Sequence, residues 1–329
     1  MHFQFTEDAL LFRAAVRELL DKECPAAHVR AMWESETGRS PELWEKLVEM
    51  GVVGLTAPSE HGGLGLDEVD LVLILEESGR AALPEPLVET TAVGLPLLRD
   101  VGALDRLPRG GIVAVGLDAF PHVTDAHVAD LLVLQRDDEL HALTRDAVEI
   151  MPQPSLDRAR RLFTVVWTPI ETTRVAFSED VRGVAARAFD RGALAVAAQL
   201  LGVADRLIEL AADYAREREQ FGKPIGSFQA VKHHLANALL ALEFARPVTY
   251  RAAYSVAHDH PDRSVHVSMA KSYASDAATL AARTALQVHG AIGYTWEHDL
   301  HLWMKRAWAL AAAWGDASWH RERVAQAVL

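Results

Sequence analysis

The sequence predicts a mainly helical protein with a small β unit in the middle of the chain. Apolar residues recur at helical spacing in residues 1–105 and again in residues 181–329. Between these regions, short runs rich in β-branched residues alternate with turn-forming residues. At about 150 residues per domain, the 329 residues are enough for roughly two domains and a large core.

The first region, residues 1–105, is predicted to be an N-terminal helical domain. Thr6 and Ser40 are hydroxyl residues that can cap the amide groups of a helix start, and Pro41 fits the first helical position because its missing N–H has no partner there. The expected helices cover about residues 7–24, 41–50, 67–80 and 90–101. The glycine-rich residues 57–65 are expected to form a loop.

Residues 106–180 are predicted to form a reduced β domain. The expected strands are residues 112–115, 131–134, 148–150, 163–168 and 172–177. We expect antiparallel pairing because none of the connections has the length of a crossover helix.

Residues 181–329 are predicted to form a C-terminal four-helix bundle. A long amphipathic helix begins near residue 181, and three more are expected over residues 227–258, 264–288 and 300–329. Their alanine-rich faces favour close helix packing.

The composition disfavours several classes of function. With 33 basic and 46 acidic residues the net charge is −13, which opposes a general affinity for nucleic acid or an anionic membrane. The longest largely apolar stretch, residues 192–204, contains Gln199 and is shorter than the ~20 residues of a membrane helix. Because Cys24 is the single cysteine and no signal-peptide pattern precedes it, we expect a cytoplasmic protein.

Several common sites are also disfavoured. The glycine-rich residues 61–65 lack the G-x-G-x-x-G spacing of a dinucleotide-binding fold. The histidine pairs have no third ligand at zinc-site spacing, so no metal site is expected. Cys24 is followed by proline in the first helical region and is expected to be buried or inert.

Residues 214–229 carry the most informative pattern. Arginines including Arg218 end one helix, a Gly-Lys-Pro turn follows, and the next helix is expected to begin with Ser227 as its cap and Gln229 in its first turn. A guanidinium binds oxygen pairs bidentately and a helix start attracts anions, so this pattern suits a phosphate or pyrophosphate. A solvated helix end without a ligand is the alternative interpretation.

Three segments resemble signatures of the FAD-dependent acyl-CoA dehydrogenase family. Residues 214–229 resemble its R-x-x-F-G-x-x-I-x-x-F-Q signature, residues 50–65 its N-terminal loop, and residues 287–297 its Q-V-H-G-G-x-G-Y segment. They follow the family's order on an α, β, α layout. The resemblance implies the α,β-dehydrogenation of an acyl-CoA thioester, FAD as hydride acceptor, and an electron-transfer protein as partner.

The resemblance also implies which residues contact the cofactor. Arg218 and Gln220 would bind the FAD pyrophosphate, and Gln287 would approach the adenosine end of an FAD held mainly by a neighbouring subunit. The predicted cofactor-binding residues are Arg218, Gln220, Phe221, Phe228, Gln229, Gln287, Gly290 and Ala291. Ala291 replaces a glycine of the family pattern.

Two parts of the family's active site are missing from the sequence. The T-E-P-x-x-G-S-D and W-I-T-N segments that hold the flavin ring are absent. The position of the family's catalytic glutamate falls on Trp314, whose indole cannot accept a proton, and a second family location, residues 192–193, has no carboxylate. Asp316 is the nearest candidate base. Because two residues along a helix rotate a side chain by about 200°, Asp316 is expected to point away from the position of the base.

These departures favour the shortened subunit of a heteromeric α2β2 complex, resembling the actinobacterial steroid-CoA dehydrogenases. Such a chain would contribute contacts to the FAD pyrophosphate, while a second acyl-CoA dehydrogenase chain supplies the base. Two alternatives remain open. The chain is a self-sufficient homo-oligomeric dehydrogenase with an atypical base, or it is a structural subunit without enzymatic activity.

Overall fold

The computed structural model describes residues 4–329, which form two compact units. The first, here called the helical unit, comprises Met1–Arg30, Val72–Leu83 and Ala193–Leu329. The second, here called the mixed unit, comprises Ala31–Leu71 and Pro84–Gly192. The mainly helical fold class with a small β portion is confirmed.

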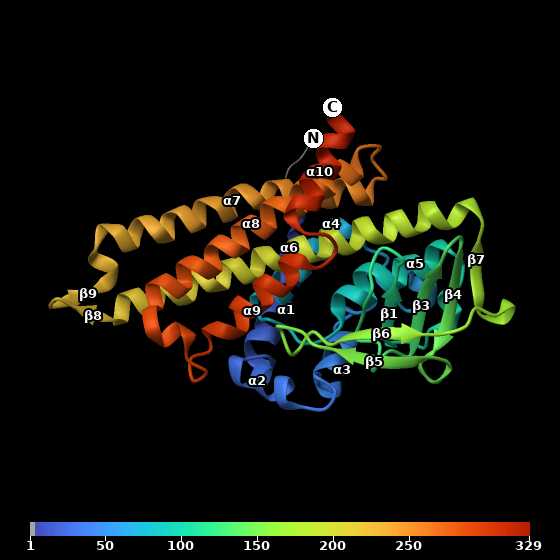
Figure 1. The fold of residues 1–329 in the computed structure, drawn as a ribbon, viewed down its shortest axis with the longest axis horizontal. Coiled ribbons are helices and arrows are strands. Elements are labelled where there is room, and N and C mark those ends of the chain that lie inside the picture. The colour runs from blue at the N-terminus through green and yellow to red at the C-terminus, as the bar shows by residue number, and fades with distance from the viewer. Residues whose placement is uncertain (1–3) are drawn as a thin grey trace. The chain divides into compact units, whose positions relative to one another are not determined.

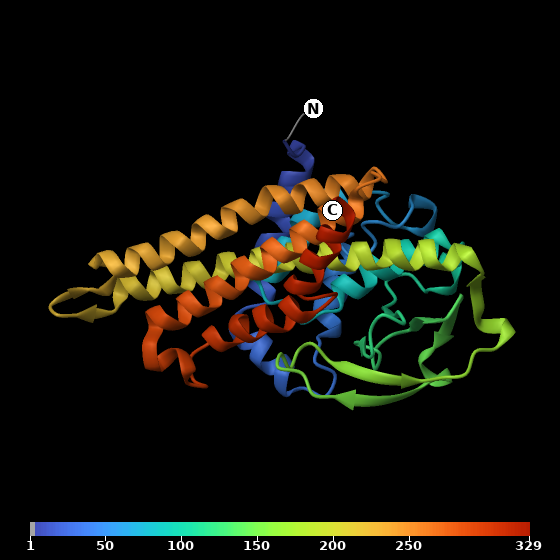
Figure 2. The same cartoon turned by 45° about the horizontal axis from the view of Figure 1, so that its top comes forward.

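Long helices dominate the helical unit. Its helices and helix segments come from α1 (Glu7–Glu23), α2 (Ala26–Glu34), α4 (Glu68–Arg80), α6 (Glu179–Glu217), α7 (Gln229–Ala257), α8 (Arg263–His289), α9 (Leu300–Ala312) and α10 (Ala317–Val328). Figures 1 and 2 show α6, α7 and α8 side by side, and α8 packs against α7, α9 and α10. Ten of the fifteen buried residues of α8 are alanine or serine, and these small side chains let neighbouring helices approach closely.

Two buried carboxylates at the end of α4 hold other helices of this unit. Glu77 accepts hydrogen bonds from Arg13 Nε (2.5 Å) and Arg17 Nε (2.7 Å), both on α1. Glu76 pairs with Arg246 and accepts a hydrogen bond from the Tyr250 hydroxyl (2.7 Å), both on α7. Burial, followed by the charge of Glu76, raises the pKa of Tyr250, so the hydroxyl remains a donor.

Glycine is required where α4 and α6 cross. A Cβ added to Gly202 would lie 1.8 Å from the carbonyl oxygen of Glu76, and one added to Gly79 would lie 2.0 Å from that of Gln199. Both contacts are with backbone atoms, which cannot rotate out of the way. The helix axes therefore approach as closely as their backbones allow.

The mixed unit contains two small sheets and short helices. Its helices are α3 (Pro41–Glu49), a π-helix (Val88–Gly94) and α5 (Leu95–Asp100). The larger sheet has the order β1 (Val113–Gly116), β3 (Leu131–Arg136), β4 (Glu139–Thr144) and β7 (Arg174–Phe177). The smaller sheet has the order β2 (Val123–Thr124), β6 (Leu162–Val166) and β5 (Glu149–Gln153).

The pairing of β1 with β3 is parallel, with Val113 opposite Leu131. The antiparallel prediction is wrong for this pair and holds for the other pairs of the two sheets. Residues 117–130 are long enough to return the chain without a helix, and they carry β2 into the second sheet. Strands β2 and β4 and helix α2 were not expected from the sequence.

Local start signals were predicted with mixed success. Thr6 Oγ1 accepts from the amide of Ala9 (3.2 Å), and Ser40 Oγ accepts from that of Leu43 (3.2 Å), as expected for caps. The Ser227 cap is wrong, because α7 begins at Gln229 and Phe228 occupies the cap position.

The last predicted helix is also wrong as a continuous element. It breaks between Ala312 and Ala317, where Trp314 and Gly315 both have positive φ. Within residues 4–329, no helix combines the length and apolar character needed to cross a membrane.

The α4–α6 crossing gives a first prediction. Gly202→Ala should destabilise the helical unit by about 1–3 kcal/mol or more, because overpacking against backbone outweighs the gain in helix propensity of about 1 kcal/mol. Gly183→Ala in the same helix is the matched control, since its Cβ would meet only Arg187 Nη1 at 3.8 Å. Thermal unfolding should give a lower Tm for Gly202→Ala alone. Equal Tm values for the two variants would contradict the close crossing.

Candidate functional site

The arginine-rich segment forms a tight hairpin beyond the end of α6 (Figure 1). Strand β8 (Glu219–Gln220) pairs antiparallel with β9 (Lys223–Pro224). The two turn residues, Phe221 and Gly222, have φ values of +54° and +78°. Positive φ at both central positions is the signature of a type I′ turn, which matches the twist of a hairpin. The Phe221 side chain is 92% exposed.

Arg218 lies at the base of this hairpin. Its backbone N–H donates to the carbonyl of Tyr214 (2.8 Å), and its carbonyl accepts from the amide of Ile225 (2.8 Å). The side chain is exposed, and within residues 4–329 no carboxylate lies within ion-pair distance of it. The Gln220 side-chain amide is also exposed and donates to the Glu219 carbonyl (2.8 Å). The backbone of Arg218 is therefore fixed while its guanidinium is available to an anion.

The start of α7 adds further donors. Phe228 is its cap residue and provides no side-chain hydrogen bond, so the first amide groups of this 29-residue helix have no side-chain acceptor. Lys223 Nζ lies 4.5 Å from the centre of the Phe228 ring, and Phe221 meets the same ring edge-on at 6.0 Å. Gln229 is exposed in the first turn.

The donors around Arg218 and the start of α7 fit the pyrophosphate of FAD. An exposed guanidinium, a nearby ammonium group and a helix N-terminus all favour a doubly charged phosphate chain. Gly226 lets the turn approach α6, because a Cβ there would lie 2.9 Å from the Ala215 carbonyl. The residues fit the group.

The second predicted cofactor segment lies at the end of α8. Gln287 is exposed in the last turn, and Gly290 and Ala291 are exposed in the 3₁₀ helix Gly290–Tyr294 that follows. Gly290 has φ +62° and ψ −139°, a conformation essentially confined to glycine.

An aromatic cluster joins these two segments. The Tyr214 ring stacks on the His289 ring with centroids 4.3 Å apart and planes inclined by 20°. His298 meets both rings nearly edge-on, at 6.4 Å from Tyr214 and 4.7 Å from His289. The structure therefore brings Arg218 and Gln287 to the same end of the helical unit. Tyr214 and His289 lie inside the two motifs, but a contact between them was not expected from the sequence.

The expected base position is part of a fixed turn between α9 and α10. The Trp314 side chain is buried, and Trp314 and Gly315 have φ values of +54° and +87°. Asp316 caps α10, because its carboxylate accepts from the amide of Trp319 (2.8 Å). The expected rotation of about 200° between Trp314 and Asp316 assumed an unbroken helix. Asp316 instead precedes α10, so this rotation does not describe its direction.

Two buried side chains hold this turn. Lys271 Nζ donates to the carbonyls of Gly315 (2.9 Å) and Ala311 (3.0 Å) and to Ser275 Oγ (3.1 Å), which matches the three donors of an ammonium group. His320 Nε2 lies 2.8 Å from the Trp314 carbonyl, so the imidazole donates from Nε2. Burial, together with the charge of Lys271, lowers the pKa of His320 to about 4, so the ring is neutral at pH 7.

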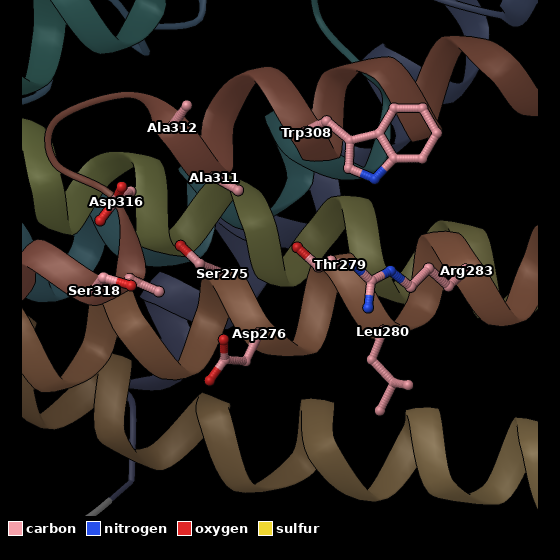
Figure 3. A pocket seen from close by; sticks show the side chains of 11 residues that line it. Ser275, Asp276, Thr279, Leu280, Arg283, Trp308, Ala311, Ala312, Asp316 and Ser318 are labelled. Atoms are coloured by element: carbon pink, nitrogen blue, oxygen red, sulfur yellow. The ribbon is translucent and has the colours of Figure 1, made fainter. Parts of the chain in front are cut away.

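An open groove of about 500 Å³ lies beside this turn (Figure 3). It is lined by Ser275, Asp276, Thr279, Leu280, Arg283, Trp308, Ala311, Ala312, Asp316, Ala317 and Ser318. Of its two carboxylates, Asp316 caps α10 and Asp276 pairs with Arg321.

The second expected base location, residues 192–193, falls where the chain passes from the mixed unit, which ends at Gly192, to the helical unit, which resumes at Ala193. Arg191, which precedes it, is buried and bonds to Glu68 (2.9 Å) and Asp100 (2.7 Å), so its guanidinium is already used within the unit. Within the described residues, no group of histidines, cysteines or carboxylates is placed to hold a metal ion.

Two family models match the sequence. The acyl-CoA dehydrogenase C-terminal domain matches residues 182–329, and the acyl-CoA dehydrogenase N-terminal domain matches residues 6–103. Acyl-CoA dehydrogenase IpdE2 of Mycolicibacterium smegmatis is 35% identical over 306 residues, which cover 92% of this chain and 93% of the relative. This chain belongs to the acyl-CoA dehydrogenase family. Members of this family are FAD-dependent oxidoreductases, so the cofactor is FAD.

Similar solved structures include two complexes. The ChsE4–ChsE5 complex from Mycobacterium tuberculosis has a chain with a TM-score of 0.82 and 25% identity, covering 99% of this chain and 98% of that chain. A chain of the Tcur3481–Tcur3483 steroid ACAD variant has a TM-score of 0.82 and 23% identity, covering 97% of each chain. At this identity the second match supports the fold alone.

The length of the chain differs between relatives. The match to the probable acyl-CoA dehydrogenase YngJ of Bacillus subtilis spans 383 positions at 25% identity and covers all of both chains, although this chain has 329 residues. The match to IpdE2 has no more positions than this chain has residues, because its 306 positions cover 92% of this chain. The short form is therefore shared with IpdE2 and not with YngJ.

The cap made by Asp316 leads to a second prediction. Asp316→Ala should lower stability by about 0.5–2 kcal/mol through loss of the cap, whereas Asp316→Asn should retain most of it, because both Asp and Asn are good caps. Asn cannot act as a base. If thermal unfolding of Asp316→Asn matches the wild type, its turnover then reports on base chemistry alone.

The buried His320 leads to a third prediction. Because its pKa is about 4 when folded and near 6.5 when unfolded, the unfolded chain binds more protons between these pH values. Stability should fall by roughly 3 kcal/mol as the pH drops from 6.5 to 4. His320→Gln keeps a donor for Trp314 but does not titrate, so its unfolding free energy should depend less on pH over this window. An unchanged slope would contradict the assignment.

Proposed function

We propose that this chain is a subunit of a heteromeric acyl-CoA dehydrogenase that acts on a bulky, steroid-type acyl-CoA thioester. It contributes Arg218 and Gln220 to the pyrophosphate of FAD and leaves proton abstraction to a partner chain of the same family. One observation carries this proposal. The two predicted FAD-binding segments are exposed together at one end of the helical unit, while the base position holds a buried tryptophan.

The residues of this chain act on the cofactor by binding and orientation. FAD, when bound, accepts the hydride that leaves the β-carbon of the thioester. Arg218 neutralises charge on the pyrophosphate, and the amide groups at the start of α7 supply further donors. Phe228 and Gln229 lie alongside the cofactor, and Gln287, Gly290 and Ala291 contact its adenosine end.

The α-proton needs a base that this chain does not offer at the family's position. Trp314 has no basic atom, and the Asp316 carboxylate is engaged by the amide of Trp319. Moving Asp316 toward a substrate would uncover the first turn of α10. A partner chain with an intact glutamate removes this conflict.

The substrate and partner classes rest on the relatives. The ChsE4–ChsE5 structure is a complex of two different chains, and the Tcur3481–Tcur3483 protein is named a steroid ACAD. A heteromeric complex with a steroid-type substrate is consistent with both. The electrons then pass to an electron-transfer flavoprotein.

A fourth prediction tests this function by flavin absorbance. The chain purified alone should carry little FAD, and co-expression with a partner chain of the same family should give a complex with FAD and dehydrogenase activity. In that complex, Arg218→Ala should weaken FAD binding about tenfold or more, which corresponds to about 1.4 kcal/mol for a lost charged contact.

Arg216→Ala is the matched control, because Arg216 lies two residues away and pairs with Asp213. It should leave FAD binding unchanged. Full FAD occupancy and turnover by the chain alone would favour the self-sufficient enzyme. An intact complex that keeps its FAD after Arg218→Ala would favour a purely structural subunit.

A further inference from the structure

We infer that Tyr214, stacked on His289, is a positioning residue that fixes the separation between the two FAD-binding segments of this chain. The effect on FAD binding rests on the proposed function. The positioning of the two segments rests on the geometry of the aromatic cluster alone. Neither side chain is among the predicted cofactor contacts.

Tyr214 is tied to the first segment through the backbone. Its carbonyl accepts the amide hydrogen of Arg218 (2.8 Å), one helical turn further along the chain. The position of the Tyr214 ring and the origin of the β8–β9 hairpin are therefore set by the same turn of α6. Displacement of this turn would displace Arg218.

His289 is tied to the second segment in the same way. Its Nδ1 lies 2.8 Å from the Ala285 carbonyl, so Nδ1–H donates and the ring is held against α8. The next residue, Gly290, leaves the helix in a conformation that only glycine readily adopts. Ala291 follows directly, and Gln287 precedes His289 by two residues. The His289 ring therefore lies within the adenosine segment, between Gln287 and Gly290.

The Tyr214–His289 stack is a contact between these two fixed points. A centroid separation of 4.3 Å and an interplanar angle of 20° place the rings in van der Waals contact over their faces. His298 closes the cluster from the side, and its Nδ1 accepts the amide hydrogen of Leu300 (3.1 Å), which anchors it to the start of α9.

The Tyr214–His289 contact matters for the proposed site because the two FAD-binding segments are exposed. Both FAD-binding segments lie at helix ends, and all of their predicted cofactor-contacting residues except the half-buried Phe228 are exposed. Helix ends are more mobile than helix centres because part of their backbone hydrogen bonding is missing. A pyrophosphate and an adenosine are joined covalently, so they bind both segments only when the distance between them matches the ligand.

The hydroxyl group of Tyr214 is not needed for this role. Within residues 4–329 no hydrogen bond of the Tyr214 hydroxyl to another residue is found. Tyr214→Phe should therefore keep the stack, whereas Tyr214→Leu, with a branched side chain and no ring, should remove it. This pair of variants separates planar stacking from simple filling of space.

A second tyrosine–histidine stack provides a matched control. Tyr254 and His258 stack with centroids 4.0 Å apart and planes inclined by 19°, but both belong to the C-terminal end of α7. Because this pair lies within one helix and does not connect the two FAD-binding segments, Tyr254→Leu should not affect the distance between the hairpin and the end of α8.

The fifth prediction is tested first in the isolated chain, without FAD. Spin labels on Glu219→Cys and Tyr294→Cys report the distance between the two segments, since both residues are exposed and Cys24 is buried. Tyr214→Leu should broaden the distance distribution about twofold or more, while Tyr214→Phe and Tyr254→Leu should leave it unchanged. An unchanged distribution in a folded Tyr214→Leu protein would overturn the inference.

The same variants are then compared in the FAD-containing complex. Loss of an aromatic pair worth about 0.5–1.5 kcal/mol should weaken FAD binding roughly two- to tenfold in Tyr214→Leu, with recovery in Tyr214→Phe. If Arg218→Ala weakens FAD binding but Tyr214→Leu does not, the positioning role is wrong. If Arg218→Ala has no effect while the label distances still broaden, the proposed function fails and the geometric role of the stack stands.

His289→Leu provides a second route to the same contact if Tyr214→Leu unfolds. When two residues act through one contact, the double variant is less affected than the sum of the single variants. The Tyr214→Leu/His289→Leu protein should therefore bind FAD about as weakly as the weaker single variant. Additive losses would show that the two residues act separately and would overturn the inference.

Discussion

The helical unit depends on residues 76–83, which comprise the last turn of α4 and the three residues that follow it. Glu77 binds α1 through Arg13 and Arg17, and Glu76 binds α7 through Arg246 and Tyr250. The carbonyl of Arg80 accepts from Trp303 Nε1 and that of Leu83 from Arg306 Nη1, which attaches α9 to the same segment. A buried carboxylate is tolerated only when its charge is matched by donors, so removing one partner leaves an uncompensated charge. These pairings determine which helices pack beside α4 and at which position along its axis.

The position of the candidate site follows from this arrangement. Gly79 and Gly202 allow α6 to lie against α4 at backbone distance, and Arg246 places α7 beside them. The end of α6, the start of α7 and the end of α8 then meet at one end of the unit, where Tyr214 stacks on His289. Within the part of the chain that the structure describes, the exposed Arg218 guanidinium has no carboxylate within ion-pair distance. Rigid helices with free polar ends suit a surface that binds a cofactor shared with a partner.

The turn between α9 and α10 is held in place by buried hydrogen bonds. A general base must be free to meet its substrate and to change its protonation state. Here the segment is fixed by Lys271 and His320, its indole is buried, and its carboxylate caps a helix. Such a turn stabilises the end of the bundle.

The sequence alone determined the local features of this protein. Caps at Thr6 and Ser40, helical periodicity, the β-rich texture of the middle region and the motif residues around Arg218 all depend on neighbours a few positions apart.

Only the tertiary structure decided features that join distant residues. The parallel β1–β3 pair, the break before Asp316 and the Tyr214–His289 stack have no local signal, because each depends on which segments meet. Lys271 illustrates the reason. A lysine within a helix is normally a surface residue, and its burial is favourable here only because two carbonyls from the α9–α10 turn and Ser275 supply its hydrogen bonds. Such compensation exists only in the folded chain.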